Sequence, residues 1–189
     1  MKRLITICVV LIMAAATADA TLIDFEAYAN FQNLHGINLG GVTLTNPTNN
    51  IVEIFDNRSD AGYHSPTKVI GSFSSTSKSV NPIVGVFDSP QTYIALWAGD
   101  KGTDDDSWEL EAFDSIFGGN SLGLVQSGTW SGDPYRKLEI NAANIWRFEV
   151  QWTGFHYGIA YDDLEFIPEP TTICLLMLGG LALLRRKPV

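Results

Sequence analysis

The sequence predicts an all-β protein, an antiparallel β-sandwich of jelly-roll type. Apolar and polar residues alternate along residues 22–28 and 108–113, and a period of two places alternate side chains on opposite faces of a sheet. Turn-forming residues separate the segments, as at 46–47 and 132–134. Between its two ends the chain shows no sustained apolar period of 3.6 residues, which argues against helices there.

The chain opens with a secretory signal peptide, which we expect to form a helix. Lys2 and Arg3 are basic, residues 4–16 are apolar, and Ala18 and Ala20 supply the small residues of an A-x-A cleavage site. An uncleaved anchor would need a longer apolar stretch. We therefore expect cleavage after Ala20, and assign residues 1–20 to the signal peptide.

Residues 21–167 are long enough for one domain with a core of its own. Strands are expected at 22–28, 42–45, 51–55, 67–73, 83–87, 92–98, 108–113, 121–128, 138–141, 145–152 and 157–166. The chain's two cysteines, Cys8 and Cys174, lie outside this region, so the domain can form no internal disulfide. With 19 acids and 7 Lys or Arg, its net charge of −12 argues against nucleic acid and anionic lipid as partners.

The C-terminal residues 168–189 form a separate segment. Pro168, Glu169 and Pro170 are followed by 14 uncharged residues, 171–184, and then by Arg185, Arg186 and Lys187. We expect a short apolar helix here, although a permanent span needs about 20 residues. The three cations match a cytoplasmic flank, which would leave the domain on the outer side of the membrane.

The Pro-Glu-Pro tripeptide, the apolar run and the terminal Arg185 and Arg186 together resemble the PEP-CTERM sorting signal of Gram-negative, exopolysaccharide-producing bacteria. The resemblance implies that a membrane exosortase recognises the motif and removes the tail. At the other end, the signal-peptide pattern predicts processing by signal peptidase. The resemblance also implies a protein exported through the inner membrane, transiently anchored there, and then held in the cell envelope or extracellular matrix.

Residues 23–26, 145–149 and 158–166 resemble the extracellular β-sandwich found in PEP-CTERM proteins, which is similar to galactose-binding-like and carbohydrate-binding jelly rolls. In such domains the two terminal strands pair, and a structural calcium ion can sit between their acids. The resemblance implies a Ca²⁺ site at Asp24, Glu26, Asp162 and Asp163, residues whose oxygens suit the ion. The alternative is that Asp24 and Glu26 form the solvated side of a strand.

No catalytic signature accompanies these segments. Glu109, Glu111, Glu139 and Glu149 could supply a carboxylate pair for glycoside hydrolysis, but strand periodicity explains them as outward-facing residues. The three histidines lack metal-binding spacing and the domain has no cysteine for thiol catalysis. We therefore expect no enzyme, and keep a glycan-active extracellular enzyme as the alternative.

Aromatic residues are the remaining candidates for a binding site, because a flat apolar ring beside hydrogen-bonding groups can stack on a sugar. Strand positions favour the core for Trp97, Trp108, Trp146 and Trp152. Trp130, Tyr63 and His64 fall in expected loops and are the candidates for contact with a glycan. The predicted function is thus an exported, non-catalytic envelope or exopolysaccharide-matrix protein, either structural or carbohydrate-binding.

Overall fold

A computed structural model describes residues 19–56, 67–72, 82–99, 105–131, 135–153 and 160–169, with only the backbone at 105–106 and 130–131. Every regular element in these residues is a strand, which confirms the all-β prediction. The two expected helices lie outside the described residues. The strands are β1 (Thr21–Ile23), β2 (Val42–Thr45), β3 (Glu53–Asp56), β4 (Lys68–Gly71), β5 (Ile83–Gly99), β6 (Asp105–Asp106), β7 (Trp108–Phe113), β8 (Ser121–Gln126), β9 (Trp130–Ser131), β10 (Arg136–Trp152) and β11 (Ala160–Pro168).

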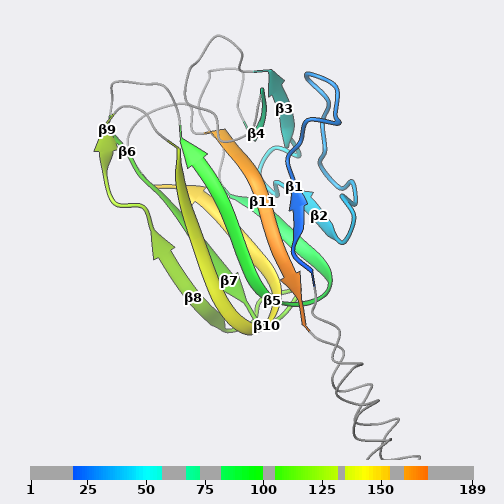
Figure 1. The fold of residues 1–189 in the computed structure, drawn as a ribbon, viewed down its shortest axis with the longest axis vertical. Helices are drawn as coiled ribbons and strands as arrows, with labels where there is room; N and C mark the ends of the chain where they lie inside the picture. The colour runs from blue at the N-terminus through cyan, green and yellow to red at the C-terminus, as the bar shows by residue number, and fades with distance from the viewer. Residues whose placement is uncertain are drawn as a thin grey trace, which may run out of the picture.

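The strands form two layers because β5 and β10 run through both of them (Figure 1). In the first layer, the first part of β5 pairs with β2 and with the second part of β10. That part of β10 pairs with β7, and β7 pairs with β8. In the second layer, the second part of β5 lies between the first part of β10 and β11. Strands β1 and β4 join β11, and β3 joins β4. All of these pairings are antiparallel.

Each of the two long strands was predicted as two separate strands, and the structure joins them through an irregular bend. Strand β5 bends at residues 88–91, which include Pro90, and β10 is irregular between Asn141 and Arg147. Asn144 has a positive φ of 65°, a conformation that asparagine tolerates better than most residues. The turn-forming residues thus bend the strands without ending them.

The core fills the space between the layers. Buried residues from the first layer include Phe87, Phe148 and Trp108, and those from the second include Phe166 and Tyr161. The rings of Phe87 and Phe166 have centroids 5.1 Å apart, and those of Trp108 and Tyr161 are 5.9 Å apart in an edge-on arrangement. Burial raises the pKa of the Tyr161 hydroxyl, as expected of a phenol held in an apolar interior.

The antiparallel pairing gives the sandwich two distinct ends. We call the tail end the one where β11 stops at Pro168, beside the bends of β5 and β10 and the β7–β8 loop, residues 114–120. The far end holds the start of β11, the end of β5 and the small β6–β9 pair (Figure 1). The two ends lie at opposite poles of the long axis of the sandwich.

The first predicted strand is shorter than expected. Strand β1 ends at Ile23 rather than at residue 28, because the chain turns at Phe25, whose φ is 60° and whose side chain is buried. The N–H of Tyr28 donates to the carbonyl of Phe25 at 3.2 Å and closes this turn. The prediction that Asp24 and Glu26 share one face of a strand is therefore wrong.

The described part of the chain contains no helix with the length and hydropathy needed to cross a bilayer.

Candidate functional site

The start of the C-terminal motif is part of the folded domain. Pro168 pairs with Gln91 at the bend of β5, and the N–H of Glu169 donates to the carbonyl of Pro90 at 2.9 Å. The Glu169 carboxylate accepts a hydrogen bond from the N–H of Asn144, at the bend of β10. The tail therefore leaves the domain from a fixed point. Pro170, Arg185 and Arg186 lie outside the described residues.

At the other terminus, Ala20 directly precedes β1, whose residues Thr21 to Ile23 pair with Phe166 to Leu164. The structure thus begins its first strand at the residue after the expected cleavage position. Ala18 lies outside the described residues.

A shallow pocket opens at the tail end, next to the point where the tail leaves. Its volume is about 180 Å³, and it is lined by Asp114, Ser115, Ile116 and Trp146. Trp146, which strand periodicity placed in the core, is only partly buried, so that prediction is wrong for this residue. Its indole N–H donates to Oδ1 of Asn144 at 2.9 Å.

Asp114 shapes the β7–β8 loop that forms one wall of this pocket. Its Oδ2 accepts a hydrogen bond from the Asn120 side chain at 2.9 Å, and its Oδ1 accepts one from the Asn120 backbone at 2.7 Å. These two bonds, the side-chain bond first, lower the pKa of Asp114. The group therefore stays a carboxylate at neutral pH and into mild acid.

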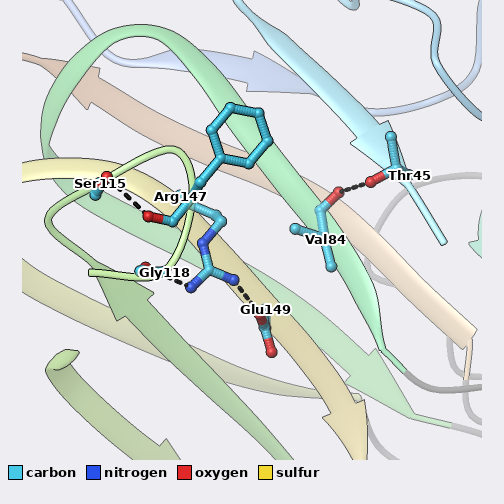
Figure 2. Close-up of polar contacts among 7 residues, drawn as sticks. Thr45, Val84, Ser115, Gly118, Arg147 and Glu149 are labelled. Carbon is cyan, nitrogen blue, oxygen red and sulfur yellow. Dashed lines mark hydrogen bonds and ion pairs between the residues drawn. The ribbon is translucent and has the colours of Figure 1, made fainter. Parts of the chain in front are cut away.

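The same loop exposes apolar side chains at its tip. Phe117 is 83% exposed and Ile116 is 40% exposed. The Ser115 hydroxyl donates to the carbonyl of Phe117 at 3.0 Å and helps to fix the loop (Figure 2). Apolar side chains that are exposed in this way add little to the stability of the fold, which makes them candidates for contact with a partner.

A row of polar side chains crosses the outer face of the first layer, near the far end. The pairing places Gln151 of β10, Glu109 of β7 and Gln126 of β8 side by side. The amide of Gln151 donates to Oε1 of Glu109, and the amide of Gln126 donates to Oε2 at 2.8 Å. One carboxylate thus fixes the orientation of both amides, and we call these three residues the amide row.

Arg147 anchors the other end of this outer face. Its guanidinium lies 3.8 Å from the centroid of the Phe113 ring, donates to the carbonyl of Gly118 at 2.9 Å and forms an ion pair with Glu149. Figure 2 shows the contacts of Arg147 with Gly118 and Glu149 beside the loop, with the hydroxyl of Thr45 donating to the carbonyl of Val84 further along the sheet. Arg147 therefore ties the β7–β8 loop to the strands beneath it.

The outer face of the second layer carries a different polar group. Lys137 lies 3.1 Å from Glu165 and 3.6 Å from Glu139, and the Tyr93 hydroxyl donates to Glu139 at 2.9 Å. Contact with the Tyr93 oxygen is the largest cause of the raised Lys137 pKa. Burial acts in the opposite direction, and the hydrogen bond to Glu165 raises the pKa further. For Tyr93, by contrast, burial is the first cause of the raised pKa. Lys137 therefore stays a cation and pairs with both glutamates.

The four glutamates considered for catalysis point outward, as predicted, but do not share one surface. Glu109, Glu111 and Glu149 lie on the outer face of the first layer, and Glu139 lies on that of the second. Glu111 and Glu149 stand directly opposite each other on β7 and β10. Glu149 is already paired with Arg147.

Glu26, one of the proposed calcium ligands, is occupied by hydrogen bonds. Its Oε1 accepts the backbone N–H groups of Thr67 and Lys68, each at 2.7 Å, and its Oε2 accepts the Thr67 hydroxyl at 2.9 Å. Burial acts to raise the pKa of Glu26, but the hydrogen bonds from Lys68 and Thr67 outweigh it and lower the pKa. Glu26 thus joins the segment after β1 to the start of β4.

Asp162 and Asp163 lie at an irregularity in β11, where its register with β5 shifts. Both are buried, Asp163 has a φ of 44°, and Oδ1 of Asp162 accepts the N–H of Asp163 at 2.8 Å. Asp24 is exposed and accepts the N–H of Glu26 at 3.2 Å. Among the described residues, no three His, Cys, Asp or Glu side chains form a group that could hold a metal ion. The four acids therefore do not gather into one cluster, and the calcium site stays a prediction.

Of the three predicted glycan contacts, Trp130 is the one whose backbone the structure describes. The structure describes the backbone of Trp130, which lies in β9 and pairs with Asp106, so the prediction of a loop at this residue is wrong. Its side chain, and the whole of Tyr63 and His64, lie outside the described atoms. Their role in binding stays a prediction.

Comparison with known proteins finds matches for the C-terminal segment and for the β-sandwich domain. Residues 166–187 match the PEP-CTERM protein-sorting motif. No curated protein matches the chain. The K2 cleaved adhesin domain of Lys-gingipain superposes with a TM-score of 0.52 at 11% identity, covering 78% of this chain and 97% of that domain.

Two further solved structures are similar at lower scores. The K1 cleaved adhesin domain of Lys-gingipain from Porphyromonas gingivalis W83 has a TM-score of 0.44 at 14% identity, covering 80% of this chain and 99% of that chain. A xylan-binding domain from CBM 22 has a TM-score of 0.44 at 10% identity, covering 76% and 96%.

The K2 likeness concerns the fold, and the motif match implies export followed by processing at the membrane. The chain therefore carries a PEP-CTERM protein-sorting motif at the end of an all-β jelly-roll-like domain.

Proposed function

We propose that this protein is exported, is anchored for a time by residues 171–184, is processed by an exosortase at its PEP-CTERM motif, and then binds polysaccharide without catalysis in the cell envelope or exopolysaccharide matrix. The motif match supports the sorting steps. The signal-peptide pattern before Ala20 supports export by the general secretory route.

The amide row is the observation that carries the binding proposal. Gln151 and Gln126 each use one amide hydrogen on Glu109. Each keeps a carbonyl oxygen that accepts and a second N–H that donates. Sugar hydroxyls need both kinds of partner, and amides already held in one orientation lose little freedom on binding. The row lies on an outer sheet face, where an extended chain of sugars can cross it.

Trp130 complements the amide row in this proposal. It follows Gln126 by four residues, and its backbone lies in β9 at the far end. An indole ring beside hydrogen-bonding side chains would supply the apolar surface that a pyranose ring stacks on. We therefore place the polysaccharide at the far end, away from the sorting tail.

The charge of the domain narrows the class of polysaccharide. Residues 21–167 carry a net charge of −12, and Glu109 adds a carboxylate to the row itself. Uronate-rich or sulfated chains would be repelled from such a surface. We therefore propose a neutral polysaccharide.

Co-sedimentation of the full chain with insoluble neutral polysaccharides tests the proposal. The double variant Gln126→Ala, Gln151→Ala should lower affinity by about tenfold or more, since each lost hydrogen bond contributes about 1 kcal/mol. Glu139→Ala, on the outer face of the other layer, is the matched control and should bind as the native protein does. Absence of binding to every polysaccharide, or an equal loss in the control, would contradict the proposal.

The enzyme alternative rests on Glu111 and Glu149, which face each other across β7 and β10. Directly opposed residues in an antiparallel pair have Cβ atoms about 5 Å apart, so their two carboxyl groups can reach the separation of about 5–5.5 Å used by retaining glycosidases. Incubation of the full chain with the same polysaccharides should release no reducing ends. Release that disappears in Glu149→Gln would replace binding with hydrolysis as the function.

A further inference from the structure

Exposed apolar side chains gather at the end of the domain from which the tail leaves. Phe117 and Ile116 are exposed in the β7–β8 loop, and Trp146 lines the pocket together with Ile116. We call these three residues the apolar tip. The β7–β8 loop and the end of β11 lie at the same pole of the sandwich (Figure 1).

Two hydrogen bonds connect the apolar tip to the tail through one residue. The N–H of Asn144 donates to the Glu169 carboxylate, and Oδ1 of Asn144 accepts the indole N–H of Trp146 at 2.9 Å. Glu169 is held a second time by its own N–H, which donates to Pro90. The last described residue of the chain is therefore fixed beside Trp146.

The distance from Glu169 to the uncharged residues 171–184 is very short. Only Pro170 separates Glu169 from Thr171, the first of the 14 uncharged residues, and one residue spans at most about 3.6 Å. If residues 171–184 enter a bilayer, the tail end of the domain must lie at its surface. The tether leaves no room for the domain to stand away from the lipid.

We propose that the apolar tip inserts into the membrane interface while the tail is in place, so that Ile116, Phe117 and Trp146 dock the domain on the lipid surface before sorting. This inference rests on the membrane stage of the proposed function. Aromatic rings favour the interface because they place an apolar body among acyl chains and a polar edge among headgroups. The partner is the bilayer itself, not a protein.

The tether is needed because the domain does not favour membranes by charge. Its net charge of −12 opposes adsorption to anionic lipid, and the carboxylates of Asp114 and Glu169 lie close to the tip. Three side chains alone bind weakly, but a short tether raises their effective concentration at the surface to the millimolar range or above. Docking should therefore end when the tail is cut.

Tryptophan fluorescence can report the docking because one tryptophan stands apart from the others. Of the five tryptophans in the chain, Trp146 lies at the tail end. Trp97, Trp108 and Trp152 lie in strand segments toward the far end, as does the backbone of Trp130. Residues 1–20 and 168–189 contain none. Quenching by lipid therefore reports on the tip and not on the tail.

The experiment reconstitutes the full chain into zwitterionic phosphatidylcholine vesicles with and without brominated acyl chains. We expect brominated lipid to quench part of the emission, Trp146→Phe to abolish that quenching, and Phe117→Ser to reduce it at least twofold. Phe31→Ser is the matched control, since Phe31 is 66% exposed beside Phe55 of β3, away from the tip. This control should quench as the native chain does.

The outcomes separate the tip from the tail. Protein that floats with the vesicles but shows no quenching dependent on Trp146 would overturn the docking and leave the anchored stage intact. Equal quenching in Phe117→Ser and the native chain would also overturn it. Protein that fails to float with vesicles would show that the tail does not insert, which would remove the membrane stage of the proposed function together with the docking.

Discussion

The ring of Phe148 in β10 lies directly over Gly85 in β5, so that a Cβ atom at position 85 would stand 2.0 Å from Cε1 of the ring. The two residues are cross-strand partners in the centre of the first layer, and Phe148 is fully buried. Glycine at this position is what lets the aromatic ring fill the core.

Gly85→Ala should therefore lower the free energy of unfolding of the full chain by about 1–3 kcal/mol or more, as overpacking does in a dense core. Urea unfolding followed by fluorescence measures the change. Gly123→Ala is the control, because its nearest atom would be Ile140 Cγ2 at 3.4 Å. If both substitutions have the same small effect, the core at Phe148 is looser than the structure shows.

Glu26 should make stability depend on pH in the acid range. Its folded-state pKa is lowered, because the hydrogen bonds from Lys68 and Thr67 outweigh burial. A lowered pKa stabilises the folded state above the ordinary value of about 4.3, and that stability is lost as the pH falls from there through the folded-state value. Glu26→Gln should lower the melting temperature at pH 7, and the difference should shrink towards pH 3. Equal destabilisation at both pH values would count against this role.

Melting of the domain with and without calcium tests the predicted calcium site, and the hydrogen bonds of Glu26 favour an unchanged melting temperature. Both oxygens of Glu26 are used by Thr67 and Lys68, and the four acids do not form a cluster among the described residues. A folded-state site at 100 times its Kd would add about 2.7 kcal/mol, or several degrees for a domain of this size. Scanning calorimetry with millimolar calcium and then with chelator would show such a shift. A shift that Asp162→Asn removes would establish the calcium site after all.

Processing should remove both ends of the chain. Mass spectrometry of protein recovered from its native host should yield a mature N-terminus at Thr21 and no peptide that extends through Arg185. Changing Arg185, Arg186 and Lys187 to Gln should weaken retention of the tail, because the cations hold it on the cytoplasmic side. Mature protein with Asp19 still joined to Leu22, or with an intact tail, would contradict the sorting proposal.

A flexible spacer between the domain and its C-terminal segment should weaken the docking of the apolar tip. Inserting about ten Gly and Ser residues between Ile167 and Pro168 leaves residues 168–189 unchanged but releases Glu169 from Asn144 and lets the domain move away from the lipid. Quenching of Trp146 by brominated lipid should then fall, because a longer flexible tether lowers the effective concentration of the tip. Flotation with the vesicles should not change. Unchanged quenching would mean that the tip binds lipid without the short tether.

The strand positions could be predicted from the sequence because alternation of apolar and polar residues is a local property. Residues 42–45 and 108–113 are strands with the predicted bounds. The long strands could not be predicted, since Pro90 and Asn144 are local turn signals whose outcome is decided by pairing with distant segments. The early end of β1 depends on the burial of Phe25 in a left-handed conformation, which no local pattern reveals.

The site residues also divide into those that a local sequence pattern reveals and those that only the fold brings together. The sorting motif is a contiguous string, so the sequence was enough to find it. The amide row joins residues from three strands and the apolar tip joins a loop to β10, and the alternation that marked Glu109 as outward could not reveal which amides would lie beside it. Trp146 has the pattern of a core residue, yet it lies next to the bend at Asn144 and opens onto the surface.

The path of β11 determines how the domain meets a pulling force. The strand runs from the far end to the tail end, between β5 on one side and β1 and β4 on the other. A load applied to the anchored tail acts along this strand, so its backbone hydrogen bonds share the load in shear and do not open one by one. The arrangement would keep the C-terminal strand in the sheet during the anchored stage, before the tail is removed.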